Sequence, residues 1–353
     1  MNAVPSFSNA TEVVAPVPAI AIEHVTKIFG PDPQSALALL KAGKSKAEVQ
    51  AETRHVIGLD DVSLSIEPNQ IFVVMGLSGS GKSTLIRHVN RLIEPTSGRI
   101  SVHGTEVLSM DKEQLRSFRR ERVAMVFQKF ALLPHRSVLD NVAYGLEVRG
   151  VRKAERRERA MHWIEIVGLK GYESVRPRQL SGGQQQRVGL ARALALDTDV
   201  ILMDEAFSAL DPLIRSGMQD QLMALQKELR KTILFITHDL DEALKIGDRI
   251  AVLKDGAVVQ TGRPEDIVLH PATAHVEAFV RDVNKARAIH VRTIMERGDF
   301  EPCTLAVPAS ARCEEVLPMF AQHDWVGVTD GEGRQVGRIA ARQVIAALAR
   351  YAS

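Results

Sequence analysis

A loop rich in glycine and serine, ending in lysine, interrupts an apolar stretch of the sequence. The loop consists of Gly76, Leu77, Ser78, Gly79, Ser80, Gly81, Lys82, Ser83 and Thr84. It follows the strand-like Ile71–Met75 and opens a helical pattern, which is the context that a phosphate-binding P-loop requires. Glycines let several backbone N–H groups approach phosphate oxygens, and the helix N-terminus adds further donors. We expect Lys82 to reach the β- and γ-phosphates of ATP and the Ser83 hydroxyl to ligate Mg²⁺.

Two adjacent carboxylates end a second apolar run. Val200–Met203 has the pattern of a buried strand, and Asp204 and Glu205 follow it directly. Carboxylates at the end of a core strand are costly unless they find partners. Together with a P-loop, this arrangement predicts that Asp204 holds Mg²⁺. Glu205 is then expected to orient and deprotonate the water that attacks the γ-phosphate.

Two further polar residues follow apolar strands. His238 comes after Ile233–Ile236 and Thr237, and Gln128 ends Val123–Phe127. Each alone is an ordinary structural histidine or loop glutamine. Because sheets of this class place ligand contacts at the carboxyl ends of their strands, we expect His238 to contact the γ-phosphate. The Gln128 amide is expected to touch Mg²⁺ or the attacking water.

A second anion site is predicted at the head of another helical run. Leu180, Ser181, Gly182, Gly183 and Gln184 precede the helical pattern Gln185–Leu196. A serine and two glycines at a helix N-terminus favour an anion. A single P-loop domain does not need a second such site. The sequence therefore predicts that this one closes onto ATP held by a partner subunit.

Alternating strands and helices must position these residues. Strand-like runs occur at Ile71–Met75, Arg99–His103, Val123–Phe127, Val200–Met203, Thr232–Ile236 and Arg249–Leu253. Residues 20–26 alternate like an early edge strand. This order predicts an α/β domain with a largely parallel core sheet. Residues from about 129 to 180 are predicted to form a helical subdomain, with an amphipathic helix over 152–167.

A helical insertion is predicted at residues 31–56. Two short helical patterns, Ser35–Ala42 and Ala47–Thr53, are separated by Gly43, and Ser45 is the expected N-cap of the second.

The pattern changes again near residue 285. We expect a strand at Cys303–Val307, a helix at Cys313–His323, two short strands around a turn at Asp330–Gly333 and a helix at Arg342–Arg350. Residues 284–353 are thus predicted to be a small α/β module.

Composition narrows the possible classes of protein. The 353 residues carry a formal net charge of +2, which gives no argument for nucleic-acid binding by bulk charge. No apolar run approaches the length of a membrane span. Residues 1–19 have no basic segment and are broken by proline, so we interpret them as a flexible tail and not a signal peptide. With only Cys303 and Cys313, a cytoplasmic location with reduced thiols is expected.

The motifs together resemble those of the ABC ATPases, over roughly residues 20–283. The stretch from Leu180 to Gln184 is similar to the LSGGQ signature, and Gln128 to the glutamine of the Q-loop. Ser208-Ala209-Leu210-Asp211 resembles the D-loop, and His238 the switch histidine. The resemblance implies that Phe29 stacks on adenine. It also implies that two ATP molecules lie head to tail between two copies of the chain, each P-loop facing the other copy's signature.

A narrower resemblance is to the ATP-binding subunits of glycine betaine/proline betaine (quaternary amine) importers. Three features carry it: the insertion at 31–56, the stretch Phe127–His135, and Asp204–Arg215 with Ala206 where many ABC ATPases have proline. The partners implied are a second copy, transmembrane permease subunits contacted around Phe130–Tyr144, and indirectly a periplasmic or extracellular substrate-binding protein. The location implied is the cytoplasmic face of the inner membrane.

The same subfamily often ends in two tandem CBS repeats, whereas residues 284–353 have room for one CBS-like module. That module either pairs across the dimer or forms a structural cap.

Three alternatives for the whole chain stay open. They are an importer ATPase for another small solute such as an amino acid or polyamine, an ABC ATPase outside transport, and a non-catalytic regulatory subunit.

Overall fold

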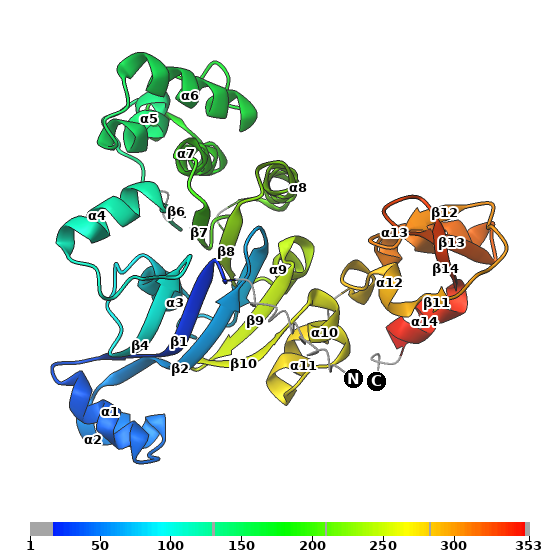
Figure 1. The fold of residues 1–353 in the computed structure, drawn as a ribbon, viewed down its shortest axis with the longest axis horizontal. Coiled ribbons are helices and arrows are strands. Elements are labelled where there is room, and N and C mark those ends of the chain that lie inside the picture. The colour runs from blue at the N-terminus through cyan, green and yellow to red at the C-terminus, as the bar shows by residue number, and fades with distance from the viewer. Residues whose placement is uncertain (1–16, 129–130, 209, 282–283, 350–353) are drawn as a thin grey trace, which may run out of the picture.

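The computed structural model describes residues 17–349 apart from 129–130, 209 and 282–283 (Figure 1). The predicted tail at 1–19 therefore lies mostly outside the described residues, as do Ala209 of the D-loop motif and Phe130 of the expected permease contact. Two sheets and a helical subdomain make up the chain as far as residue 280, and a separate small sheet follows near the C-terminus.

The central sheet has six strands. Their order is β10 (Ala257–Gly262), β9 (Arg249–Lys254), β3 (Ile71–Met75), β8 (Thr232–Thr237), β7 (Val200–Asp204) and β6 (Val123–Val126). All neighbours from β9 to β6 are parallel, so the carboxyl ends of these five strands share one edge. The predicted parallel core is therefore confirmed, and the loops that follow β3, β6, β7 and β8 meet at that edge.

Both faces of the central sheet are buried. Along β3, Phe72 and Val74 pack into one apolar core, and Ile71, Val73 and Met75 pack into another. Two buried faces explain why these strands are continuous apolar runs without alternation. The first core also holds α3 (Lys82–Val89) and the antiparallel sheet β2-β1-β4-β5. The second holds α8 (Pro212–Leu229) and α9 (Leu240–Ile246).

A helical hairpin connects β1 to β2 in the antiparallel sheet. The strands are β1 (Ile20–Phe29), β2 (Val56–Ile66), β4 (Ser97–Val102) and β5 (Thr105–Glu106). The hairpin consists of α1 (Pro33–Lys41) and α2 (Lys46–Thr53), where the sequence predicts helices. Ser45 caps α2 as expected, since it accepts from the Glu48 N–H while the Glu48 carboxylate accepts from the Ser45 N–H.

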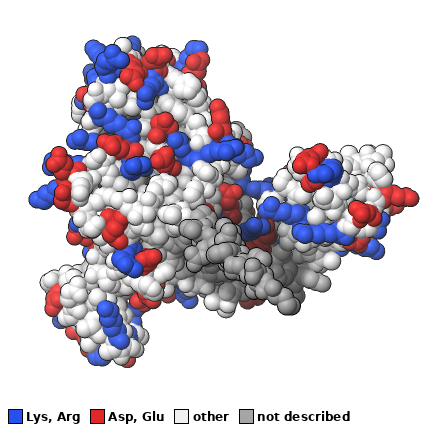
Figure 2. Space-filling model, viewed as in Figure 1, with Lys and Arg blue, Asp and Glu red and all other residues white. Residues whose placement is uncertain are grey.

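A cluster of helices lies beyond the β6 edge of the central sheet (Figure 1). It contains α5 (Val138–Val148), α6 (Lys153–Ile166) and α7 (Gly182–Ala195), with a single 3₁₀ turn at Pro177–Gln179. Before β6, α4 (Lys112–Glu121) begins at an Asp111 cap. After β10 come α10 (Pro264–Leu269) and α11 (Ala274–Val280). Lys and Arg are interspersed with Asp and Glu on the visible face of the helical cluster (Figure 2).

The C-terminal module has its own apolar core and a sheet of order β11-β14-β13-β12. Its elements are a 3₁₀ turn at Lys285–Arg287, α12 (Val291–Ile294), β11 (Glu296–Arg297), β12 (Ala306–Pro308), α13 (Cys313–Val316), a 3₁₀ helix at Leu317–Ala321, β13 (Trp325–Thr329), β14 (Gln335–Ala340) and α14 (Ala341–Ala349). The strand–helix–strand–strand–helix order of its main part agrees with the pattern expected from the sequence.

Some expected boundaries are wrong. The single helix predicted at Cys313–His323 stops at Val316, because Pro318 lacks the N–H that would continue the ladder. The strand predicted at Cys303–Val307 begins only at Ala306. Four strands, β2, β5, β10 and β11, were not predicted from the sequence. Within the described part of the chain, the structure contains no helix with the length and apolarity of a membrane span.

Candidate nucleotide-binding site

The P-loop follows β3 and leads into α3. Gly81, the N-cap of α3, has φ +99°, and a Cβ there would come within 2.4 Å of the Gly58 carbonyl oxygen. Only glycine fits this left-handed, tightly packed position. The Lys82 ammonium is buried and donates to the carbonyl oxygens of Gly76 and Leu77 at 2.8 and 2.9 Å. The Lys82 side chain therefore reaches back across the P-loop to its first two residues, Gly76 and Leu77.

Burial lowers the pKa of Lys82, although the charges of Glu205 and Asp204 act in the opposite direction. A buried ammonium gains from an anion placed beside it, because the anion replaces the lost hydration. Ser80, in the same loop, is buried, and its hydroxyl makes no hydrogen bond within the part of the chain that the structure describes. An unpaired buried hydroxyl in the same loop as a buried cation fits a site that receives phosphate oxygens.

Ser83 and Asp204 meet where α3 faces the end of β7. The Ser83 hydroxyl donates to Asp204 Oδ1 at 2.8 Å, and Arg87 Nη2 lies 3.2 Å from Asp204 Oδ2. The Asp204 side chain is almost completely buried. A hydroxyl and a carboxylate oxygen side by side are the hard ligands that Mg²⁺ prefers, so these residues fit that ion.

Glu205 lies between the ends of three strands. Gln128 Nε2 donates to Glu205 Oε2 at 2.8 Å, and His238 Nδ1 is 3.5 Å from the same oxygen. Glu205 has φ +47°, which is uncommon for a residue with a side chain, and its N–H donates to the Ile236 carbonyl. Because of this left-handed backbone conformation, the chain changes direction at Glu205, directly after β7. The structure thus brings Gln128, Glu205 and His238 together.

Phe29 lies near the P-loop, with Gly58 between them. Its ring covers Gly58, where a Cβ would come within 2.7 Å of Phe29 Cε2, and the Gly58 carbonyl oxygen would be 2.4 Å from a Cβ on Gly81. The residue Phe29 is 41% exposed, and the Lys27 ammonium lies 5.1 Å from the ring centroid. An accessible aromatic face therefore lies beside the P-loop.

The signature residues form the start of α7. The Ser181 hydroxyl accepts from the Gln184 N–H, and the Gln184 side chain accepts from the Ser181 N–H at 2.9 Å. Ser181 and Gly182 are exposed, and a Cβ on Gly182 would meet nothing within 4 Å. Among the described residues, no hydrogen bond or ion pair joins Leu180–Gln184 to the P-loop. The structure therefore does not bring the signature to the P-loop of the same chain.

The D-loop is tied to the segment after β8. Asp211 caps α8 by accepting from the Ile214 N–H at 3.1 Å and is exposed. Arg215 donates to the Leu210 carbonyl and to Asp239 Oδ2, each within 3.1 Å. Since Asp239 follows His238 in sequence, Arg215 connects the D-loop with the histidine segment.

Three contacting residues were missed by the sequence analysis. Arg87 lies four residues after Ser83 and therefore on the same face of α3, which is a signal that spacing alone provides. Arg215 lies four residues after Asp211 on α8 in the same way. Gly58 left no usable signal, because its role depends on the pairing of β1 with β2.

Comparisons with known proteins agree with this geometry. Residues 59–208 match the family profile described as ABC transporter. The glycine betaine/carnitine transport ATP-binding protein GbuA of Listeria monocytogenes is 55% identical over 278 residues, which cover 79% of this chain and 70% of the relative. The trimethylamine N-oxide transport system ATP-binding protein TmoW of Pelagibacter ubique is 42% identical over 330 residues, which cover 93% of this chain and 96% of the relative.

A solved structure resembles the ATPase part. The dimeric ATP-binding cassette MJ0796, in a post-hydrolysis state bound to ADP and Pi, is 32% identical with a TM-score of 0.59. The match covers 69% of this chain and 98% of that one. With this fold, these motifs and these relatives, the chain belongs to the ATP-hydrolysing, ATP-binding proteins of ABC transporters.

Proposed function

We propose that the residues at the carboxyl edge of the central sheet bind and hydrolyse ATP, and that each has a distinct role. Lys82 and the P-loop N–H groups bind the β- and γ-phosphates, and Phe29 stacks on adenine. Ser83, Asp204 and Gln128 hold Mg²⁺, which when bound neutralises charge on the phosphates. The contact of Gln128 and His238 with one Glu205 oxygen supports Glu205 as the group that orients and deprotonates the attacking water.

The second half of each active site comes from another copy of the chain. The separation of Ser181–Gln184 from the P-loop within one chain supports this arrangement, as does the exposed position of Ser181 and Gly182. A γ-phosphate supplies the negative charge that the N-terminus of α7 favours. ATP thus closes a head-to-tail dimer, and hydrolysis removes the bridging charge. Asp211 lies in the same interface.

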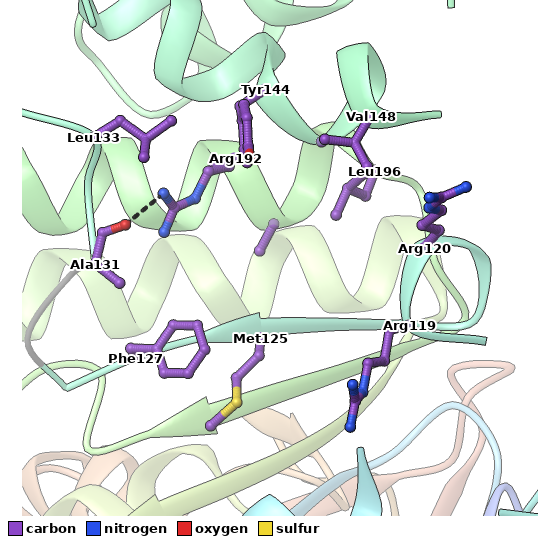
Figure 3. Close-up of a pocket in the computed structure, with 12 residues that line it drawn as sticks. Arg119, Arg120, Met125, Phe127, Ala131, Leu133, Tyr144, Val148, Arg192 and Leu196 are labelled. Carbon is purple, nitrogen blue, oxygen red and sulfur yellow. Dashed lines mark hydrogen bonds between the residues drawn. The ribbon is translucent and has the colours of Figure 1, made fainter. Parts of the chain in front are cut away.

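A groove between α4, α5 and α7 is the proposed surface for the permease. A cavity of about 320 Å³ is lined by Met125, Tyr144 and Val148, among other residues, with Arg119 and Arg120 at one end (Figure 3). Tyr144 and Val148 are 37% and 42% exposed. An exposed apolar groove rimmed by arginines is typical of a partner site. Two of its lining residues, Phe127 and Ala131, lie on either side of Gln128 in the sequence, so a partner bound there is linked to the nucleotide site.

The transported solute is proposed to be a quaternary or trimethylated amine: glycine betaine, proline betaine or choline, with trimethylamine N-oxide as a close chemical analogue. The transport functions of the relatives GbuA and TmoW support this class, and TmoW matches nearly the whole chain. The solute itself contacts other subunits. An importer of an amino acid or polyamine is the second candidate.

The test is to copurify the chain with its permease and binding protein and to measure ATP hydrolysis with each solute in turn. Glycine betaine, proline betaine, choline or trimethylamine N-oxide is expected to stimulate hydrolysis. Stimulation by proline or a polyamine alone would instead assign the second candidate.

Residues 284–353 are proposed to be a single CBS-like module whose surface contacts the second copy. This part of the proposal rests on its order of strands and helices and on its separate core. The remaining boundaries proposed are an ATPase domain at 20–283, a helical insertion at 31–56 and a helical subdomain at about 129–180. The chain is proposed to act at the cytoplasmic face of the inner membrane through its permease, with a substrate-binding protein as an indirect partner.

A further inference from the structure

The helical hairpin α1–α2 is joined to the sheet immediately beside Phe29. Phe29 pairs with Val56, so the hairpin leaves and re-enters the sheet at the candidate adenine-stacking residue. His55 closes this base, because its Nε2 accepts from the Asp32 N–H at 3.1 Å and its Nδ1 lies 2.9 Å from the Thr53 carbonyl oxygen. The buried His55 ring also fills the space beside Gly30. The hairpin is therefore held firmly at the edge of the nucleotide site.

A second contact extends from the hairpin toward the P-loop. Lys46, the first residue of α2, donates from Nζ to the Asp255 carbonyl oxygen and lies 3.4 Å from Asp60 Oδ2. Asp255 and Gly256 form the turn between β9 and β10. Lys46 thus bridges three segments that are far apart in the sequence: the hairpin, β2 and this turn.

The β9–β10 turn lies against the back of the P-loop. The Gly256 N–H donates to the Ser80 carbonyl at 3.0 Å, and the Gly256 carbonyl accepts from the Asp60 N–H at 2.9 Å. Gly256 has φ +77°, and a Cβ there would come within 2.7 Å of the Gly58 carbonyl oxygen. Backbone packs directly on backbone here. A displacement of the turn consequently moves the P-loop carbonyl to which it is bonded.

We propose that the helical hairpin is a working part of the nucleotide site and that Lys46 is a positioning residue for ATP. It holds the Asp255–Gly256 turn against Ser80, so that the P-loop N–H groups keep the spacing that phosphates require. This inference rests on the proposed ATP-binding role of the P-loop. It assigns a function to the 33–53 hairpin, whose side chains provide none of the catalytic groups.

Lys44 supplies a matched control on the same hairpin. Its Nζ lies 2.6 Å from Glu52 within the hairpin, and no contact joins it to the β9–β10 turn in the described part of the chain. The full-length variants Lys46→Ala, Lys46→Arg and Lys44→Ala are compared, with Lys82→Ala as the positive control. The measurements are equilibrium binding of a fluorescent N-methylanthraniloyl ATP with Mg²⁺, and KM and kcat for ATP hydrolysis.

Lys46→Ala is expected to weaken binding and raise KM about fivefold, which corresponds to about 1 kcal/mol, the net contribution of one typical hydrogen bond, with a smaller change in kcat. Lys46→Arg is expected to restore most of the affinity, because arginine retains a donor of similar reach. The proposal is overturned if Lys46→Ala binds the nucleotide as Lys44→Ala does, while Lys82→Ala still loses binding. If Lys82→Ala also binds normally, the nucleotide-site assignment itself is wrong.

Discussion

The hydroxyl of Ser83 donates a 2.8 Å hydrogen bond to Asp204 Oδ1, joining the first turn of α3 to the end of β7. The two residues are 121 positions apart in the sequence. They meet because β8 pairs with both β3 and β7, so that the loops after these strands share one edge of the sheet. The hydrogen bond occupies the position where the metal site is proposed.

Removing the Ser83 hydroxyl is predicted to weaken Mg²⁺ binding. Ser83→Ala loses a proposed ligand, whereas Ser83→Thr keeps a hydroxyl on the same atom and serves as the control. The Mg²⁺ concentration that gives half-maximal ATP hydrolysis should rise about tenfold or more in Ser83→Ala. It should change little in Ser83→Thr. Identical Mg²⁺ curves for the alanine variant and the unchanged chain would remove Ser83 from the metal site.

The groove of Figure 3 is predicted to be required for assembly with the permease. Val148→Glu places a charge on its apolar wall and should abolish copurification with the permease subunits, since burying an unpaired charge costs several kcal/mol. Met161→Glu is the control, because Met161 is similarly exposed on α6 but does not line the groove. ATP binding by both isolated variants should be unchanged. Normal assembly of Val148→Glu would place the permease elsewhere.

The junction between α10 and the C-terminal module is predicted to depend on pH. Glu265 is buried, and its carboxylate oxygens lie 3.5 Å from His290 Nδ1 and 3.5 Å from Arg292 Nη2. Burial raises the pKa of Glu265. The His290 contact, the Glu265 backbone N–H and the charges of His290 and Arg292 outweigh burial and lower the pKa from 4.5 to about 2.

A carboxyl whose pKa is lowered by folding stabilises the fold above its unfolded pKa. For Glu265 this stabilisation is complete above about pH 4.5 and is lost as the pH falls toward 2. Glu265→Gln should therefore destabilise the chain by on the order of 2 to 3 kcal/mol at pH 7. The difference from the unchanged chain should shrink below pH 4.5.

Thermal unfolding from pH 7 down to about pH 2.5 measures this difference, because most of the predicted loss falls between pH 4.5 and 2. Glu314→Gln is the control, because Glu314 forms an exposed ion pair with Arg287, worth less than about 1 kcal/mol. A deficit in Glu265→Gln that stays constant through the acid range would contradict the assignment.

Much of the site could be predicted because each motif is local. The P-loop, the carboxylates after β7 and the histidine after β8 each follow an apolar strand, and parallel strands bring such ends together. Contacts set by long-range pairing were not predictable in this way. Gly58 lies under Phe29 only because β1 pairs with β2, and Lys46 reaches Asp255 only because the hairpin folds back over the β9–β10 turn. Neither residue has a local pattern that reveals its role.

The C-terminal module shows the limit of periodicity. Its helices and strands were predicted in the correct order, but Pro318 ends a helix that hydrophobic spacing alone extends to His323. Its short strand β11 was missed, since two residues carry no alternation. The junction of Glu265 with His290 and Arg292 likewise depends on docking, which no local pattern encodes.

In the proposed dimer, each chain supplies half of two shared ATP sites. The most direct test is the mass in solution of Glu205→Gln with and without MgATP, beside the double variant Glu205→Gln with Ser181→Arg. The account predicts that MgATP converts Glu205→Gln from one chain to two, with hydrolysis nearly abolished. The double variant should bind ATP and stay a single chain, because the signature end of α7 can no longer receive the γ-phosphate. If Glu205→Gln remains a single chain with ATP bound, or turns over normally, the shared site is contradicted.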